Sequence, residues 1–227
     1  MKINHTCIVC VGERKSMADA TKLVSVTDSR AYPLECKFGH QTIVFLSDFK
    51  FQILFEIGLH AIKDGYYREA VSSFSAALER FYEHFTKTVL FRKEGADNLD
   101  KCWKLVSNQS ERQLGAFIFL YLSEVGELPT ILKSEDSGFR NSVIHKGKIP
   151  TKQEAITFGQ KVSDLIMPKF EILLDNYWDQ SLDMLFSQDL DLDPEHYGKP
   201  ASSRDINAFL STIAKEKSVA KYVEELV

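Results

Sequence analysis

The chain has 227 residues, of which 44% are hydrophobic and 26% charged, so it is long enough for one main domain with a sizeable core plus something small. Its net charge of -4 argues against a protein that grips nucleic acid over its whole surface. No apolar run reaches the roughly 18 residues that span a bilayer, and the first residues lack the apolar stretch of a secretory signal. We therefore expect a cytoplasmic protein.

Residues 1–47 differ in pattern from the rest of the chain. Residues 21–27 and 41–46 are short β-branched runs bounded by turn-forming residues, which predicts small antiparallel strands. So few residues cannot bury a hydrophobic core unaided, and a bound metal ion would stabilise them. Three of the four cysteines lie in this segment, and their uneven spacing favours a metal site over a disulfide framework.

The candidate metal ligands are Cys7 and Cys10, spaced C-x2-C, and Cys36 and His40, spaced C-x3-H. Each pair lies on a tight turn, and the chain between the pairs can form a hairpin, which matches the tetrahedral coordination of structural Zn²⁺. We therefore predict a small β domain that resembles a zinc ribbon. Its metal site would be closed, with no open position for chemistry. His5 is an alternative fourth ligand, and three reduced thiols beside an unrelated surface histidine are the alternative to a metal.

From residue 48 onward, apolar residues recur at spacings of three and four, which predicts helices. The first two should pack antiparallel through their apolar faces. The predicted elements, in chain order, are a helix from 48 to Asp64-Gly65, a helix over about 66–90, a short helix over 97–106, and a fourth helix that a capping box at Ser110 and Gln113 opens and Gly126 and Pro129 close.

A polar loop over 134–137 is predicted to lead into the next helix, which Gly147 ends. Thr151 and Glu154 have the spacing of another capping box, and they open a long last helix that Pro168 can bend.

The predicted fold class is therefore mainly α. Residues 48–186 form an antiparallel helical bundle, and 187–227 form an acidic linker with a helical tail that packs on the bundle or on a partner. Residues 171–196 include eight acidic residues and no Lys or Arg, so the remainder of the chain is mildly basic. We expect positive potential to gather around residues 138–170.

Arg140, Asn141 and His145 lie close together, just before Gly147 and Pro150. A guanidinium can hold a phosphate with two hydrogen bonds, and an imidazole can give or take a proton near neutral pH. Together they suit phosphodiester cleavage without a metal. On an ideal helix His145 lies about 40° from Asn141 but about 140° from Arg140, so the arginine must reach around. If two subunits pair through the helix face that carries Asn141 and His145, two histidines and two arginines could share one groove.

The motif R-N-x3-H-K-G-x-I-P begins at Arg140, and segment 65–81 supplies a helix of the same bundle. In this combination the chain resembles the HEPN superfamily, whose catalytic members carry R-x4-6-H. Arg140 and His145 match that pattern with a spacer of four, and Asn141 fills the polar position that often follows the arginine. Glu79 matches an acidic position often seen near HEPN sites, although it could equally be an exposed charge on a helix surface.

The resemblance covers residues 49–185 and implies a metal-independent endoribonuclease, an RNA-binding hydrolase of toxin–antitoxin or antiviral defence systems. Such proteins act as dimers whose motifs face each other, which implies a homodimer through the motif helix and an antitoxin or regulatory protein as a further partner. Other HEPN domains have lost catalysis, so the alternative is a non-catalytic dimerisation or binding module whose zinc ribbon contacts nucleic acid or a partner protein. A zinc-dependent enzyme is disfavoured because the candidate ligands would all be used.

Overall fold

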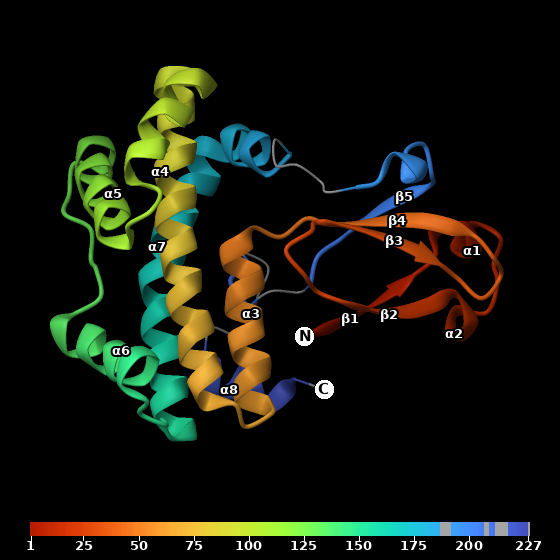
Figure 1. Ribbon diagram of the computed structural model, residues 1–227, viewed down its shortest axis with the longest axis horizontal. Coiled ribbons are helices and arrows are strands. Elements are labelled where there is room, and N and C mark those ends of the chain that lie inside the picture. Colours follow the sequence, from red (N-terminus) through yellow and green to blue (C-terminus); the bar gives the residue numbers. More distant parts are fainter. Residues whose placement is uncertain (187–191, 207–208, 212–217, 227) are drawn as a thin grey trace. The chain divides into compact units, whose positions relative to one another are not determined.

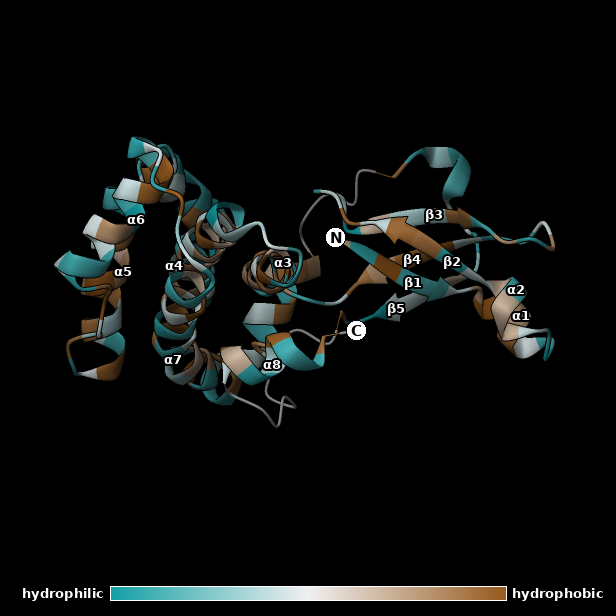
Figure 2. Cartoon of the chain, turned by 90° about the horizontal axis from the view of Figure 1, so that it is seen from below, coloured by the Kyte–Doolittle hydropathy of each residue, from teal (hydrophilic) through white to brown (hydrophobic). Residues whose placement is uncertain are grey.

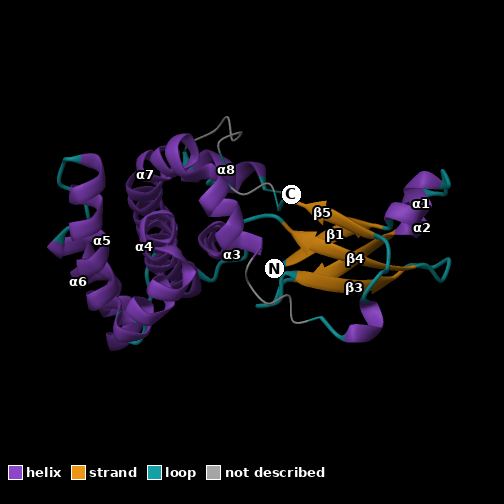
Figure 3. Cartoon of the chain, turned by 90° about the horizontal axis from the view of Figure 1, so that it is seen from above, coloured by secondary structure: helices purple, strands orange, loops and turns teal. Residues whose placement is uncertain are grey.

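The computed structural model describes residues 1–186, 192–206, 209–211 and 218–226 (Figure 1). These residues form two compact units: 1–48 with 192–206, and 49–186 with 209–211 and 218–226. In the described part of the chain, all strands belong to the first unit and all long helices to the second (Figure 3). The mainly helical fold with a small N-terminal β part is as predicted. Every described helix is too short or too polar to cross a lipid bilayer.

The first unit contains a two-stranded and a three-stranded sheet. β1 pairs antiparallel with β2, while β4 pairs antiparallel with β3 and parallel with β5. The predicted strands over 21–27 and 41–46 are confirmed as β2 and β4, and β1 and β3 were not predicted. The elements are β1 (Lys2–Thr6), α1 (Ile8–Gly12), α2 (Met17–Ala20), β2 (Thr21–Ser25), β3 (Ala31–Glu35), β4 (Gln41–Leu46), a 3-10 turn (Pro194–His196) and β5 (Ala201–Arg204).

Strand β5 lies within the region predicted to be an acidic linker and helical tail. Its register pairs Ile43 with Ala201 and Leu46 with Arg204, so this late segment of the chain completes the N-terminal sheet. Its sequence, Ala-Ser-Ser-Arg, contains no β-branched or aromatic residue, and therefore gave no local strand signal. The pairing depends on the neighbouring edge of β4, which a pattern within one segment does not reveal.

The second unit is an α-helical bundle in which α4 contacts α3, α5, α6 and α7. Figures 1 and 2 show α4 between α3 and α5. The predicted short helix over 97–106 continues α4 beyond Gly95, whose backbone angles (φ 75°, ψ 174°) interrupt the helix. The helices are α3 (Lys50–Lys63), α4 (Tyr67–Val106), α5 (Ser110–Val125), α6 (Ser134–Lys146), α7 (Lys152–Phe186) and α8 (Val219–Glu225).

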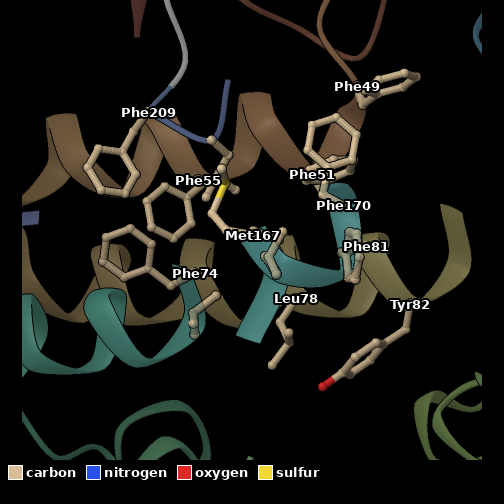
Figure 4. Packing of buried hydrophobic residues seen from close by; sticks show 14 of the residues in the cluster. Phe49, Phe51, Phe55, Phe74, Leu78, Phe81, Tyr82, Met167, Phe170 and Phe209 are labelled. Carbon is tan, nitrogen blue, oxygen red and sulfur yellow. The ribbon is translucent and has the colours of Figure 1, made fainter. Parts of the chain in front are cut away.

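Aromatic side chains fill the centre of the bundle (Figure 4). Phe74 of α4 is fully buried and its ring centroid lies 4.7 Å from that of Phe55. A Cβ atom built on Gly58 of α3 would lie 2.6 Å from the Phe74 ring, and one built on Gly159 of α7 would lie 2.8 Å from it. Both distances are too short for a carbon contact, so these two glycines make room for the ring.

Helix boundaries bear out several predictions and correct others. Glu154 accepts hydrogen bonds from the backbone N–H and the hydroxyl of Thr151, and the Thr151 hydroxyl accepts one from the Glu154 N–H, which confirms that capping box. The capping box at Ser110 is wrong, because Gln109 is the N-cap residue and Gln113 is buried, donating to the Ser107 carbonyl (2.7 Å).

Two further differences concern α6 and α7. The predicted loop over 134–137 is wrong, since these residues form the first turn of α6, where Glu135 and Asp136 interact favourably with the helix dipole. Gly147 ends this helix in the left-handed conformation, as predicted (φ 73°). In α7 the non-helical backbone angles occur at Tyr177 and not at Pro168.

Residues 209–211 and 218–226, at the end of the predicted tail, pack on the bundle. Leu210 and Val219 are fully buried, and α8 contacts α3 and α7. Glu56 of α3 is itself buried and accepts hydrogen bonds from the Phe209 N–H and the Tyr222 hydroxyl, each at 3.0 Å. These residues therefore belong to the helical unit, whereas residues 192–206 belong to the first unit. Residues 187–191, 207–208, 212–217 and 227 of the predicted linker and helical tail lie outside the described residues.

Candidate functional site

Two turns of the first unit carry the predicted metal ligands. Cys7 immediately precedes α1, and Cys10 lies within it. Cys36 follows β3 and His40 precedes β4, so the hairpin turn holds them close together. The Cys36 N–H donates to the His40 carbonyl (3.1 Å), and the Gly39 N–H donates to the Cys36 carbonyl (3.0 Å). Gly39 adopts φ 79°, a left-handed conformation that glycine reaches without steric cost.

The structure brings these four side chains together. Cys10 Sγ lies 3.6 Å from Cys36 Sγ and 3.3 Å from His40 Nδ1, and Cys7 Sγ lies 3.8 Å from the same nitrogen. All four donor atoms lie within 4.8 Å of one another. Zinc bonds of about 2.3 Å to sulfur and about 2.0 Å to nitrogen place tetrahedral donors about 3.6–3.8 Å apart. The donor set and its spacing therefore fit a four-coordinate metal ion.

Burial and hydrogen bonding distinguish the thiols. Burial raises the pKa of Cys10 to about 12, and hydrogen bonds with Cys36 and Cys7 contribute to that rise. Burial also acts to raise the pKa of Cys36, but hydrogen bonds from the backbone N–H groups of Phe38 and His40, together with those from Cys10 and Cys7, outweigh burial and lower that pKa. A thiol such as Cys10 needs a cation beside it to become a thiolate. A metal ion would supply that charge.

Glu13 supports the candidate ligand His40 from outside the cluster. His40 offers Nδ1 to the cluster, and its Nε2 lies 3.5 Å from Glu13 Oε2. Lys15 lies 2.8 Å from the same carboxylate oxygen and is the main reason that the pKa of Glu13 is lowered. A carboxylate behind a metal-binding imidazole fixes its orientation and tautomer. The alternative ligand His5 instead faces Ser202 Oγ at 3.4 Å and is not part of the cluster.

The second candidate site is centred on Arg140 of α6. Arg140 Nη1 donates to Glu79 Oε1 of α4 (3.4 Å), and its Nε donates to Asn141 Oδ1 (3.1 Å). The side chains of Arg140 and Glu79 are 27% and 34% exposed, so the ion pair is accessible from solvent. Three of the four residues predicted for this site therefore meet in a single chain.

His145 is the exception. It lies in the last turn of α6 and is exposed. Within the described residues, no hydrogen bond or ion pair joins it to Arg140, Asn141 or Glu79. Arg140 does not reach around α6 toward His145 as predicted. On an ideal α-helix residues five apart project at about 140° to each other, and Arg140 pairs instead with Glu79.

The predicted positive potential around the motif is partly neutralised. Lys148 pairs with Glu154 (2.6 Å) and Lys161 pairs with Asp136 (2.5 Å). Lys169 is buried in α7, where its ammonium donates to Thr130 Oγ1 and burial lowers its pKa to about 8. Beside His145, positive charge comes from Lys146 and from Arg68, whose Nη2 donates to the Ile144 carbonyl (3.4 Å).

A pocket beside Arg140 was not predicted from the sequence. Arg140, Glu79 and Tyr82 line it, together with apolar side chains from α5 and α7. Glu79 and Tyr82 are three residues apart and so share one face of α4. The pocket forms where helices distant in sequence converge, which spacing along one helix does not reveal.

Comparison of the chain with family models, with curated proteins and with solved structures gave no match. The resemblance to HEPN proteins therefore depends on the motif residues themselves and on the helices that carry them.

Proposed function

We propose that this protein is a metal-independent endoribonuclease of the HEPN type, which cleaves RNA by attack of a ribose 2′-hydroxyl and serves a toxin–antitoxin or antiviral defence system. One observation carries the proposal. Arg140 is oriented by Glu79 and Asn141, while His145 on the same helix is exposed and free of these partners. Arginine and histidine on one accessible helix can bind a phosphate and transfer protons.

In the proposed reaction the 2′-oxygen attacks phosphorus and the 5′-oxygen leaves, giving a 2′,3′-cyclic phosphate and a 5′-hydroxyl. His145 takes the 2′-hydroxyl proton or protonates the leaving oxygen. Arg140 stabilises the extra negative charge on the phosphorane-like transition state. Its Nη2 group has no hydrogen bond to a described protein atom, so it is free for a phosphate oxygen. Asn141 and Glu79 hold the guanidinium in place.

The proposed active form is a homodimer that pairs through α6. Within one chain, Arg140 and His145 occupy different faces of this helix and do not meet. A two-fold axis near α6 would bring His145 of one subunit toward the groove of the other. The two histidines could then divide the roles of base and acid.

Three variants test the catalytic roles in one assay. His145→Ala and Arg140→Ala should each reduce cleavage of single-stranded RNA by about 10²–10³-fold, because each removes a group that acts in the transition state. Lys146→Ala is the matched control, since it removes an exposed cation next to His145 and should retain most activity. The buffer contains EDTA, and the metal content of the protein is measured after the assay. Undiminished cleavage by His145→Ala would overturn the proposal.

We further propose that the ion at Cys7, Cys10, Cys36 and His40 is Zn²⁺ and that its role is structural. Three thiolates and one imidazole are ligands that zinc prefers, and four protein ligands leave no position for water or substrate. Lys15 and Lys37, beside the cluster, are paired with Glu13 and Asp19. Elemental analysis of protein purified without chelators should find one zinc per chain, and its absence would contradict this assignment.

The second candidate function is a non-catalytic dimerisation or binding module, whose zinc-ribbon-like unit contacts nucleic acid or a partner protein. The separation of His145 from Arg140 within one chain favours it. Expression in a bacterial host separates the two functions. Growth arrest that disappears in His145→Ala supports the nuclease. Arrest that persists in this variant supports the module.

A further inference from the structure

The pocket beside Arg140 combines apolar walls with a few polar groups. Leu78 of α4, Leu114 of α5 and Phe158 of α7 contribute apolar side chains, and Tyr82 and Arg140, whose side chains end in a hydroxyl and a guanidinium, also line the pocket. Ligand pockets commonly have this character, because apolar walls provide affinity and a small number of polar groups fix orientation.

Tyr82 has an unused hydrogen-bonding group. The residue is only 5% exposed, and its hydroxyl has no hydrogen-bond partner among the described protein atoms. Its ring packs against that of Phe117 with centroids 4.4 Å apart, and its hydroxyl points away from Phe81 (Figure 4). Burial raises the pKa of Tyr82, so the hydroxyl stays protonated and can donate as well as accept. A buried hydroxyl without a partner is costly unless a ligand or water pairs with it.

The charges of the pocket limit what it can hold. Among the described residues that line it, Arg140 is the only cation, and Glu79 already neutralises part of that charge. Glu111 adds a second carboxylate. A ligand with several anionic groups would be repelled, whereas a single phosphate could contact the free edge of Arg140. A flat ring with hydrogen-bonding groups on its edge suits the apolar walls and the Tyr82 hydroxyl.

We propose that this pocket binds the base of the RNA nucleotide next to the cleaved phosphate, with Tyr82 hydrogen-bonding the edge of the base while Arg140 holds the phosphate. The proposal rests on the proposed ribonuclease function and adds a subsite that selects the base. Tyr82 is then a specificity-determining residue. Its position one helical turn from Glu79 places base recognition beside the arginine that Glu79 orients.

Binding of the four ribonucleoside 3′-monophosphates to the full-length protein tests the pocket without any cleavage. One base should bind more tightly than the others. Tyr82→Phe should weaken the binding of that nucleotide by about two- to tenfold, the range of one hydrogen bond, and reduce the preference among bases. Arg140→Ala should weaken the binding of all four nucleotides to the same extent. Because the Tyr82 hydroxyl has no partner among the described protein atoms, Tyr82→Phe should keep the fold intact.

A second pair of variants tests occupancy of the pocket. Ser137 lines the pocket from α6, and Ser137→Phe should fill part of it and abolish the base preference. Ser134→Phe, at an exposed position on the same helix, is the matched control and should bind like the wild type.

The outcomes separate the pocket from the ribonuclease. Tyr82-dependent nucleotide binding in a protein that does not cut RNA would support the pocket and overturn the proposed function. His145-dependent cleavage whose base preference and nucleotide binding are unchanged by Tyr82→Phe and Ser137→Phe would overturn the pocket and leave the function standing.

Discussion

The two units of this protein are stabilised in different ways. Near its candidate metal ligands, the first unit buries Cys7, Cys10, Ala20 and Cys36, which are small side chains that a shared ion can crosslink. The second unit buries a continuous set of large aromatic side chains drawn from several helices. The first unit also buries Ile3, Tyr32, Ile43, Val44 and Leu46, but this core is much smaller than that of the helical bundle, so a crosslink would contribute more to its stability.

The candidate sites differ in the same way. The four candidate metal ligands converge within one chain, because each pair lies on a tight turn. Arg140 and His145 lie on one helix, but Arg140 pairs with Glu79 and no hydrogen bond joins it to His145, so the proposed reaction draws on a second subunit. Spacing on a turn can fix a complete site, whereas spacing on a helix fixes only the face on which each residue lies.

Loss of the metal should have the largest effect, and it should be confined to the first unit. Cys10 is fully buried in the cluster, and structural zinc sites contribute about 10–16 kcal/mol of binding free energy to folding. Cys10→Ser should lose the metal and the dispersed NMR signals of residues 1–48. The fluorescence of Trp103 and Trp178, both in the helical unit, should stay unchanged.

Cys102→Ser is the control for that experiment, because Cys102 is an exposed cysteine of the helical unit. It should retain the metal. If Cys10→Ser left the signals of the first unit dispersed, a metal crosslink would not be what holds that unit together.

Truncation of the aromatic core should destabilise the helical unit and leave the metal in place. Phe74 is fully buried between α3 and α7, and Phe→Ala changes at such sites cost about 3–5 kcal/mol. Urea unfolding of Phe74→Ala followed by tryptophan fluorescence should show this loss, with zinc content equal to that of the wild type. Concurrent loss of zinc would argue that the two units do not fold independently.

Gly159→Ala should have a smaller effect of the same kind. The new methyl group would meet the Phe74 ring at 2.8 Å, and overpacking of this kind costs about 1–3 kcal/mol. Gly115→Ala in α5 is the control, because among the described residues no atom outside the neighbouring backbone of its own helix lies within 4 Å of the added carbon, and alanine favours helix by about 0.5–1 kcal/mol. Relative to the wild type, the denaturation midpoint of Gly159→Ala should therefore fall and that of Gly115→Ala should rise. Equal shifts would refute the close contact with Phe74.

Substitution of Lys169 should have the smallest effect, which is a change in how the stability of the helical unit depends on pH. Burial lowers its pKa from 10.5 to about 8 in the folded protein. Between these two values the unfolded chain binds more protons, so stability contributed by this group rises with pH across that window. Lys169→Met should be more stable than the wild type near pH 7, by an amount on the order of 1 kcal/mol.

That advantage should shrink as the pH rises from 8 toward 10.5, because the wild-type lysine becomes neutral. Urea unfolding at pH 7, 8.5 and 10 measures the trend. A difference between Lys169→Met and the wild type that stays constant with pH would show that Lys169 keeps an ordinary pKa.

Much of the fold could be predicted from local patterns. The helices α3 and α4, the stop at Gly147 and the capping box of Thr151 and Glu154 follow from apolar spacing and backbone chemistry within a few residues. β5 could not be predicted in this way, because its pairing with β4 depends on contacts across most of the chain.

The same distinction applies to the sites. The metal ligands were predicted because Cys and His at short spacings on turns are typical of zinc-binding segments. The HEPN resemblance suggested only that Glu79 lies near the site, and its contact with Arg140, 61 residues away in the sequence, was not predicted. Tyr82 carried no such signal, because an aromatic residue at helical spacing usually belongs to the core, and only the convergence of several helices places it in a pocket.

RNA cleavage through the 2′-hydroxyl is most directly tested with two otherwise identical single-stranded oligonucleotides, one of which carries deoxyribose at the cleaved position. Wild-type protein should cut the all-ribose strand to a 2′,3′-cyclic phosphate and a 5′-hydroxyl, and should leave the deoxyribose position uncut. Cleavage at the deoxyribose position, or failure to cut any RNA with zinc-loaded dimeric protein, would contradict the proposed ribonuclease.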